Sequence, residues 1–512
     1  MTNRRASAAL WLGLLLSATA CSTPPPEKAA APQEAPPSPS PAVAAAPSEA
    51  EAPAAGPENA ASEAVLRDWT GDLDGMVKRR VIRVLTTYSK TDFFIDKGAQ
   101  LGLVPDAMQM FEDDLNKKLK NKSIRVHVVI LPVSHDELIP ALVKGRGDIV
   151  VAGTMITDPR KEQVDFTNPT RNHVSAIVVT GPGAPPIGRV EDLAGKEVYL
   201  RASMVSAQGV ERFNAELAAK GLPPAKIRPA PEALADEDIL EMVNAGLVKA
   251  TIAFDYIAEF WKQIFPNLVL NTGAAVKTEG QIAWMVRKNS PQLKAELNAF
   301  LARYPEGSKK RNVLLQKYLK SVKFAKQATS PAQAAKIEST IGLFRKYGEK
   351  YSIDYLLMMA QGYQESQLNQ NAKSRVGAVG VMQVMPATGK ELKVGDIKQI
   401  EPNVHAGVKY MRFIRKSFFE NEPMDDLNKG LFTFAAYNAG PGRIRQLRAE
   451  AAERGLDPNV WFGNVERVVS ERIGRETVTY VSNIYKYYIA YRLVQDREAA
   501  RDRAKSEVKA QQ

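Results

Sequence analysis

The sequence predicts an α/β domain followed by an all-α domain. Residues 80–325 alternate short runs rich in β-branched residues with stretches of helical apolar spacing, which is the pattern of an α/β fold with parallel strands. From Ser330-Pro331 to about residue 494, strand patterns become scarce and helical spacing dominates. With 512 residues, the chain is long enough for each domain to bury a hydrophobic core of its own.

The N-terminus has the pattern of an export signal. Arg4 and Arg5 precede an apolar run over residues 8–16 that is too short to remain as a membrane span. Small residues follow, directly before Cys21, the only cysteine of the chain. Residues 1–20 therefore resemble a bacterial lipoprotein signal, which implies that Cys21 is lipidated; a secretory signal with an incidental cysteine is the alternative. Ser22, in place of Asp, favours anchoring in the outer membrane, facing the periplasm.

The composition of the chain predicts a flexible tether after Cys21 and indicates the kind of partner that the protein meets. Residues 22–62 are mostly Pro, Ala, Ser and Glu, and we expect a disordered, extended tether because so little of this segment can be buried. The formal net charge of +12 favours acidic partners. An exported protein rarely meets nucleic acid, so we expect cell-wall polymer and anionic lipid instead. Residues 495–512 are charged and low in apolar content, which predicts a tail or frayed helix.

The elements of the first domain follow in order. Two helices are predicted, over residues 104–120 and 136–144. Four segments read as strands: 81–85, 124–130, 148–153 and 176–180. Ligands of such folds bind at the carboxyl ends of the strands.

Several motifs of this domain resemble the periplasmic solute-binding proteins of the polar amino acid type. They include Gly145 and Gly147 before Asp148-Ile149-Val150-Val151-Ala152-Gly153, then Ile156-Thr157-Asp158-Pro159-Arg160 and Asp192-Leu193-Ala194-Gly195-Lys196. The resemblance implies a two-lobed domain that binds an amino acid or a muropeptide. It also implies that Arg160 clamps the ligand carboxylate and that Asp255 holds its ammonium group. A surface arginine and a helix N-cap are the alternatives for these two residues.

The second domain is predicted to be helical throughout. Its helices are expected over residues 334–346, 353–365, 404–418, 431–437 and 476–491. Glu365 ends one of these apolar runs, and no Asp or Glu occurs from Ser366 through Lys390. An isolated acid beside apolar residues is what a general acid with a raised pKa requires, and this indicates cleavage of a sugar bond.

Four ordered blocks resemble the lytic murein transglycosylases of the soluble type. They are Gln364-Glu365-Ser366 with Gly377-Ala378-Val379-Gly380-Val381-Met382-Gln383, then Glu401-Pro402-Asn403, then Ala435-Ala436-Tyr437-Asn438-Ala439-Gly440, and Glu476-Thr477-Val478-Thr479-Tyr480-Val481. The resemblance implies a lysozyme-like fold that acts on peptidoglycan. Glu365 would protonate the oxygen between N-acetylmuramic acid and N-acetylglucosamine, and would then deprotonate the C6 hydroxyl to close a 1,6-anhydro ring.

The same resemblance assigns roles to the neighbours of the acid. Ser366 would orient the acid, Gly377 and Gly380 would admit the glycan to the backbone, and Met382 and Gln383 would line the cleft. Tyr437 and Asn438 would contact the sugar near its N-acetyl group, and Tyr480 would bond to Glu365 or the substrate. Each has a structural alternative: a helix-end hydroxyl, turn glycines, a core methionine, a loop amide, a turn asparagine and packed tyrosines.

Two other functions remain open. A retaining or inverting hydrolase needs a second carboxylate, which Glu401 or Asp396 would have to supply. A receptor whose helical domain only docks on peptidoglycan is the other alternative. The four histidines are scattered singly without ligand spacing, so we expect no metal and no cofactor.

Overall fold

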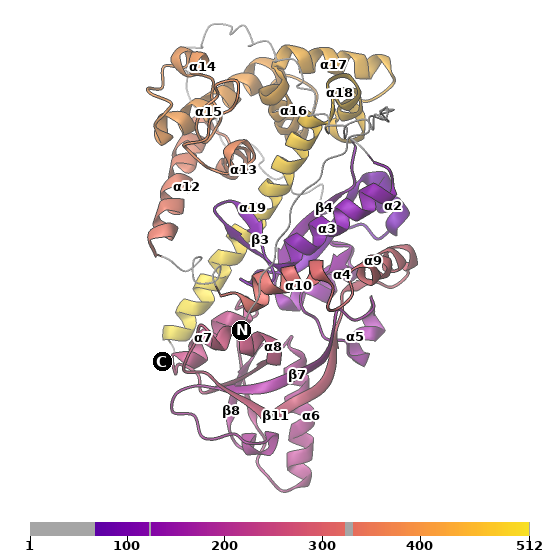
Figure 1. The fold of residues 1–512 in the computed structure, drawn as a ribbon, viewed down its shortest axis with the longest axis vertical. Coiled ribbons are helices and arrows are strands. Elements are labelled where there is room, and N and C mark those ends of the chain that lie inside the picture. The colour runs from indigo at the N-terminus through magenta and orange to yellow at the C-terminus, as the bar shows by residue number, and fades with distance from the viewer. Residues whose placement is uncertain (1–66, 122–123, 323–330, 511–512) are drawn as a thin grey trace, which may run out of the picture. The chain divides into compact units, whose positions relative to one another are not determined.

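The computed structural model describes residues 67–121, 124–322 and 331–510 (Figure 1). The predicted signal segment, Cys21 and the tether lie outside these ranges. Within them, no helix is both long and apolar enough to cross a membrane.

One lobe of the first domain is built on a five-stranded sheet. β1 (Val81–Thr87) pairs in parallel with β4 (His127–Val133) and β5 (Ile149–Val150), while β12 (Met285–Arg287) pairs antiparallel with β5 and β6 (Val164–Phe166). Most residues of β1 and β4 are buried, as expected for parallel strands covered on both faces. In sheet order the strands are β4 (His127–Val133), β1 (Val81–Thr87), β5 (Ile149–Val150), β12 (Met285–Arg287) and β6 (Val164–Phe166).

The other lobe contains a three-stranded antiparallel sheet, so the prediction of parallel strands is wrong here. β7 (Arg171–Thr180) lies between β10 (Ala250–Phe254) and β11 (Val269–Ile282). β7 leads the chain into this lobe and β11 leads it back, which is why the two neighbours run in opposite directions (Figure 1). Parallel pairing returns only between β8 (Glu197–Leu200) and β9 (Lys226–Pro229).

Amphipathic helices cover these sheets. In α3, Val104, Met108, Phe111 and Leu115 recur at helical spacing and are buried, which packs the helix onto its sheet. A small hairpin, β2 (Phe94–Asp96) with β3 (Ala99–Leu101), precedes it. The helices of this domain are α2 (Leu73–Arg79), α3 (Leu103–Lys118), α4 (Leu138–Val143), α5 (Asp158–Gln163), α6 (Val205–Ala219), α7 (Asp236–Asn244), α8 (Asp255–Lys262), α9 (Pro291–Arg303) and α10 (Lys309–Leu315).

The second domain is helical, as predicted. All five predicted helices form, but α14 (Pro386–Glu391), α17 (Pro441–Glu453) and α18 (Glu466–Ile473) were not expected. The apolar residues of α17 are few and its surface is rich in Arg and Glu, which hides the period of Ile444, Leu447 and Ala451. The helices are α12 (Pro331–Tyr351), α13 (Tyr355–Ser366), α14 (Pro386–Glu391), α15 (Ile400–Ile414), α16 (Asp426–Ala439), α17 (Pro441–Glu453), α18 (Glu466–Ile473) and α19 (Arg475–Ala510).

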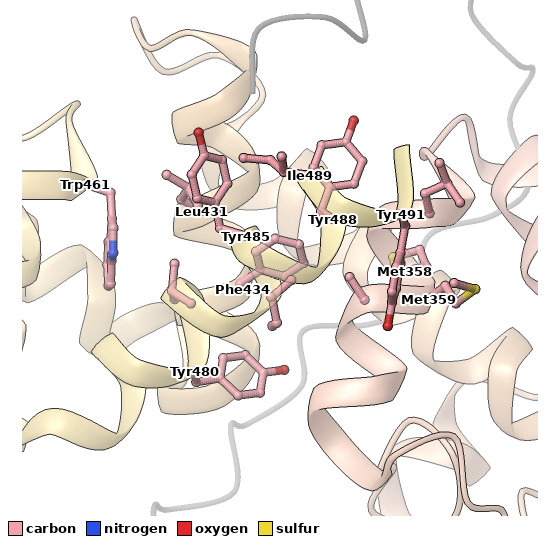
Figure 2. Packing of buried hydrophobic residues seen from close by; sticks show 14 of the residues in the cluster. Met358, Met359, Leu431, Phe434, Trp461, Tyr480, Tyr485, Tyr488, Ile489 and Tyr491 are labelled. Carbon is pink, nitrogen blue, oxygen red and sulfur yellow. The ribbon is translucent and has the colours of Figure 1, made fainter. Parts of the chain in front are cut away.

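α19 supplies a row of aromatic residues to the core of this domain. Tyr480, Tyr485 and Tyr488 come from α19 and pack with Phe434 of α16 and Met358 of α13 (Figure 2). The Tyr488 hydroxyl also donates to the Asp354 carboxylate (2.7 Å), while the other oxygen of Asp354 accepts the Leu356 amide and caps α13. α13 is therefore fixed at its start by the same helix that supplies Tyr480.

The charged residues 495–510 continue α19 as a regular helix. Ala504 and Val508 are buried, and the Arg501 guanidinium donates to both carboxylate oxygens of Asp238 (2.6 and 2.7 Å). The charge pattern of this segment predicts a tail or frayed helix. In the structure, one of its charged residues, Arg501, instead forms a bidentate ion pair.

The loop between α13 and α14 is held by one buried side chain. Asn403 of α15 accepts the Met382 amide (2.8 Å) and donates to the Val379 and Ile397 carbonyls (2.8 and 2.9 Å). Gly380 has a φ of +80°, and a Cβ there would lie 2.3 Å from the Asn403 side chain. A glycine is required at this position for both reasons.

We therefore expect Gly380→Ala to lower the free energy of unfolding by about 2–4 kcal/mol, since strain and overlap add. Gly377→Ala is the matched control, because Gly377 also has a positive φ (+96°) but no atom lies within 4 Å of its Cβ position. Gly377→Ala should lower the free energy of unfolding by only about 1 kcal/mol. Urea unfolding followed by circular dichroism measures both, and equal losses would contradict the role given to Asn403.

Candidate active site

Glu365 lies in the last turn of α13, partly buried. Burial raises the pKa of its carboxyl to about 7, while a hydrogen bond from Tyr480 acts in the opposite direction and lowers it. The carboxyl is therefore close to half ionised near neutral pH. A group in that state can both give and take a proton.

Tyr480 approaches Glu365 from α19. Its hydroxyl donates to Glu365 Oε1 (2.5 Å) and accepts a bond from Gln361 Nε2 (3.1 Å). Gln361 is fully buried one turn before Glu365, on the same helix. The chain Gln361–Tyr480–Glu365 orients the hydroxyl so that its proton points at the carboxylate.

Tyr437 and Met382 form the adjacent wall. The Tyr437 hydroxyl donates to the Met382 carbonyl (2.9 Å), and its ring packs edge-on against Tyr410 at 5.4 Å between centroids. Burial and the charge of Glu365 raise the pKa of Tyr437 well above its usual value, so Tyr437 lies near the acid and stays neutral. The Met382 side chain is completely buried against Gly362 and Gly407, where core packing explains it.

Ser366 and Gln383 stabilise the glycine-rich loop. The Ser366 hydroxyl donates to the Val381 carbonyl (2.9 Å) and accepts the Asn369 amide (3.1 Å). Gln383 Nε2 donates to the Gly380 carbonyl (2.8 Å). Ser366 thus ties the loop to the end of α13, whereas Gln383 holds the loop together from within.

The two glycines and Asn438 differ in their surroundings. Gly377 faces open space, whereas Gly380 faces Asn403. Asn438, at the end of α16, accepts a bond from the Thr477 hydroxyl (2.7 Å) through its Oδ1. That bond joins α16 to the first turn of α19, which carries Tyr480.

Neither candidate for a second acid, Glu401 or Asp396, contributes to the pKa shift of Glu365. Glu401 accepts bonds from Lys346 (2.7 Å) and Tyr347 (3.0 Å), and Asp396 is an exposed residue that accepts the Lys398 amide (3.0 Å). Burial and Tyr480, and no carboxylate, account for the pKa of Glu365. No second carboxylate contributes to the raised pKa of Glu365.

Metal chemistry receives no support from side-chain clusters. Over the described ranges, no group of three or more His, Cys, Asp or Glu residues lies close enough together to hold an ion. His405 stacks on Tyr347 (4.2 Å between centroids) and hydrogen bonds to the Tyr351 hydroxyl (2.7 Å).

The two residues predicted to hold the ligand of the first domain differ in their surroundings. Arg160 lines a cavity between the lobes. Asp255 is not among the residues that line it, and its carboxylate accepts the amides of Ser175 (3.0 Å) and Tyr256 (2.8 Å). Asp255 is the first residue of α8, and ligand binding by Arg160 and Asp255 stays a prediction.

Sequence reasoning missed Gln361 and Asn403. Gln361 interrupts the apolar run Leu356–Ala360, and a polar residue that continues the buried face of a helix is a usable signal. Asn403 was noticed only as part of a motif. Its bonds go to loop amides and carbonyls, a role that no periodic pattern reveals.

The pKa of Glu365 predicts a pH-dependent effect on stability. The group binds its proton more tightly in the folded protein (about 7) than in the unfolded chain (4.5), so its contribution is present below pH 4.5 and lost as pH rises through 7. We expect Glu365→Gln to stabilise the protein at pH 8 by about 1–3 kcal/mol and to have little effect at pH 4.5. Urea unfolding at the two pH values measures this difference.

Glu401→Gln is the matched control. Lys346 and Tyr347 lower the pKa of Glu401, so its removal should not stabilise the protein at pH 8. A stabilisation by Glu365→Gln that is equal at both pH values would contradict a raised pKa.

Two domain families match this chain in separate segments. The family of bacterial extracellular solute-binding proteins, family 3, matches residues 81–321, and the transglycosylase SLT domain matches residues 342–459. The second match contains Glu365, Tyr437 and Asn438. Tyr480 lies beyond it, although the structure places its hydroxyl on Glu365.

Relatives match over both domains together. The membrane-bound lytic murein transglycosylase F of Desulfosudis oleivorans is 26% identical over 80% of this chain and 89% of the relative. The protein of the same name from Pseudoalteromonas translucida is 26% identical over 84% and 90%. Among solved structures, an ancestral amino acid-binding protein is 26% identical, with a TM-score of 0.40, and covers 48% of this chain and 99% of its own.

Glu365 on α13 lies within the segment that matches the transglycosylase SLT domain, and its partner Tyr480 comes from α19. The chain joins a family 3 solute-binding domain to a transglycosylase SLT domain, and over both domains it is similar to proteins named membrane-bound lytic murein transglycosylase F.

Proposed function

We propose that the protein cleaves the β-1,4 bond between N-acetylmuramic acid and N-acetylglucosamine in peptidoglycan without consuming water, leaving 1,6-anhydro ends. The observation that carries this proposal is the partly buried carboxyl of Glu365, whose pKa is raised to about 7 by burial without a contribution from a second carboxylate. Hydrolysis by a pair of acids needs two such groups on either side of the bond.

In the first step, protonated Glu365 gives its proton to the glycosidic oxygen as the bond to C1 breaks. The substrate's own N-acetyl carbonyl then attacks C1 and takes the place of an enzyme nucleophile. Tyr480 stabilises the carboxylate that remains, since its hydroxyl donates to Oε1 (2.5 Å).

In the second step, ionised Glu365 takes the proton of the C6 hydroxyl, and the oxygen closes on C1 to form the 1,6-anhydro ring. The N-acetyl carbonyl leaves C1 and the carboxyl is protonated again, so the enzyme returns to its starting state. A pKa near neutrality suits both steps, because a fully ionised acid fails in the first and a fully protonated one fails in the second.

Digestion of purified sacculi tests the product. Mass spectrometry should find muropeptides lighter by one water than those released by a hydrolase. Products of hydrolase mass would overturn the transglycosylase mechanism. An absence of any product would favour the receptor with a docking domain.

Two glutamate variants separate the roles of the carboxylates. Glu365→Gln should lower the rate by about 10²–10⁴-fold, which is the usual contribution of a general acid. Glu401→Gln should remain active, because Glu401 is occupied by Lys346 and Tyr347. Loss of activity in Glu401→Gln with hydrolase products would support the two-acid alternative.

Tyr480→Phe tests the bond to the acid. Because this bond lowers the pKa of Glu365, its removal should raise that pKa and move the alkaline limb of the kcat/KM profile to higher pH, with a rate loss of about tenfold or more at pH 7. Tyr487→Phe is the control on the same helix, since Tyr487 packs against Tyr363 away from this bond. An unshifted pH profile in Tyr480→Phe would contradict the role of the hydroxyl.

The N-terminal sequence and the relatives, which are named membrane-bound, support a location at a membrane. We propose that lipidated Cys21 anchors the enzyme to the outer membrane, and that the segment 22–62 lets it search the adjacent peptidoglycan. Cys21→Ser should move the protein from the membrane fraction to the soluble periplasmic fraction. Retention of the variant in the membrane would contradict the anchor. The first domain, in this proposal, senses a cell-wall fragment or amino acid and adjusts the activity.

A further inference from the structure

Gln361 is a polar residue in an apolar part of α13. Its neighbours Met358, Met359 and Ala360 belong to the buried core of the second domain, and the Gln361 side chain is completely buried as well (Figure 2 shows the two methionines). Its Nε2 donates to the Tyr480 hydroxyl (3.1 Å), whereas no group of the described chain donates to its Oε1. A buried amide with an unpaired carbonyl is unfavourable for stability, so packing does not account for this residue.

The orientation of this amide sets the direction of the hydrogen bonds around Tyr480. Because Nε2 of Gln361 points at the hydroxyl oxygen, that oxygen is the acceptor of this bond. The single proton of the hydroxyl then goes to Glu365 Oε1 (2.5 Å). With the amide turned over, the carbonyl of Gln361 would compete with Glu365 for that one proton.

This direction decides which oxygen of Glu365 can hold the catalytic proton. A proton on Oε1 would meet the proton of the Tyr480 hydroxyl, so the protonated acid carries its proton on Oε2. Within the described ranges Oε2 of Glu365 accepts no hydrogen bond, which leaves this oxygen for the substrate. Tyr480 keeps its own proton, since burial and the charge of Glu365 raise the pKa of the phenol well above its usual value.

The groups that face this carboxyl are neutral. Tyr480 approaches from α19 and Tyr437 from α16, and burial together with the charge of Glu365 raises the pKa of each phenol. Among the described residues, no charged side chain contributes to the pKa of Glu365. Proton exchange is therefore confined to the Glu365 carboxyl and the substrate.

We propose that Gln361 is a positioning residue, which acts through Tyr480 to confine the catalytic proton to Oε2 of Glu365. The proposal rests on the proposed function of the second domain. In the first step, the proton on Oε2 passes to the glycosidic oxygen as the bond from that oxygen to C1 breaks. In the second step, Oε2 takes the proton of the C6 hydroxyl as its oxygen bonds to C1 and the N-acetyl carbonyl leaves. Tyr480 donates to Oε1 throughout and neither gains nor loses a proton.

Gln361→Met tests the role of the amide, because it keeps the length of the side chain and removes the bond to Tyr480. We expect kcat for cleavage of soluble peptidoglycan fragments to fall about 3–10-fold with KM unchanged, the usual effect of losing one neutral hydrogen bond. The alkaline limb of the kcat/KM profile should move to higher pH, because a hydroxyl without the amide donates more weakly to Glu365. An unchanged kcat and an unchanged profile would overturn the proposal.

A double-mutant cycle with Tyr480→Phe shows whether Gln361 acts through the hydroxyl. In the Tyr480→Phe background, Gln361→Met should cause no further loss of kcat and no further shift of the pH profile. Additive losses would mean that Gln361 supports the core independently of Tyr480, and the proposal would fail.

Infrared difference spectra report the position of the proton directly. Each protein is measured against its own Glu365→Gln variant, at a pH where Glu365 is protonated. The wild type should show one carbonyl band, from a C=O that accepts the Tyr480 bond. Gln361→Met should add a second band at higher wavenumber, since its proton can occupy either oxygen. A single unshifted band in Gln361→Met would contradict the confinement to Oε2.

Thermal denaturation separates this role from packing. Removal of an amide with an unpaired carbonyl should leave the melting temperature unchanged or raise it, although kcat falls. A lower melting temperature together with additive kinetic losses would identify a packing residue and overturn the proposal. Anhydro products from the wild type with no change in Gln361→Met would remove only this proposal, whereas their absence from the wild type would remove the proposed function itself.

Discussion

The hydrogen bond between Tyr480 and Glu365 is the interaction on which the rest of the site depends. It joins the last turn of α13 to α19 and holds a carboxyl that burial alone would keep neutral. Burial favours the protonated form and the tyrosine favours the ionised form. Their balance places the pKa near 7, and a catalyst that must first give and then recover one proton needs that balance.

The surroundings serve to keep this pair in place. Asn438 bonds to Thr477 at the start of α19, Tyr488 holds the start of α13, and Ser366 fastens the glycine-rich loop to the end of α13. Asn403 of α15 also holds the loop in place, because it bonds to the loop on both sides of Gly380. Several residues expected to touch the glycan thus have a structural task in the absence of substrate, and their contacts with sugar remain predictions.

The sequence predicts the catalytic acid better than it predicts the residues that hold the acid and its loop in place. Glu365 stands out because no other Asp or Glu follows it as far as Lys390, and the helices around it have clear apolar periods. Gln361 and Asn403 do not stand out, since a polar residue in a helix shows its burial only when the opposing helices are known. The ligand role of Asp255 was implied by the family resemblance and stays a prediction, while the structure shows that its carboxylate also accepts two backbone amides. The antiparallel sheet of β7, β10 and β11 was missed because strand composition does not encode direction.

The most direct test of the account is the ionisation of Glu365 itself. Difference infrared spectroscopy of the wild-type protein against Glu365→Gln isolates the carboxyl band of this one residue across a pH titration. We predict that the band disappears with a midpoint near pH 7. A midpoint near 4.5, the ordinary value for a glutamate, would mean that the carboxyl is already ionised at neutral pH, and Glu365 could not then act as the acid.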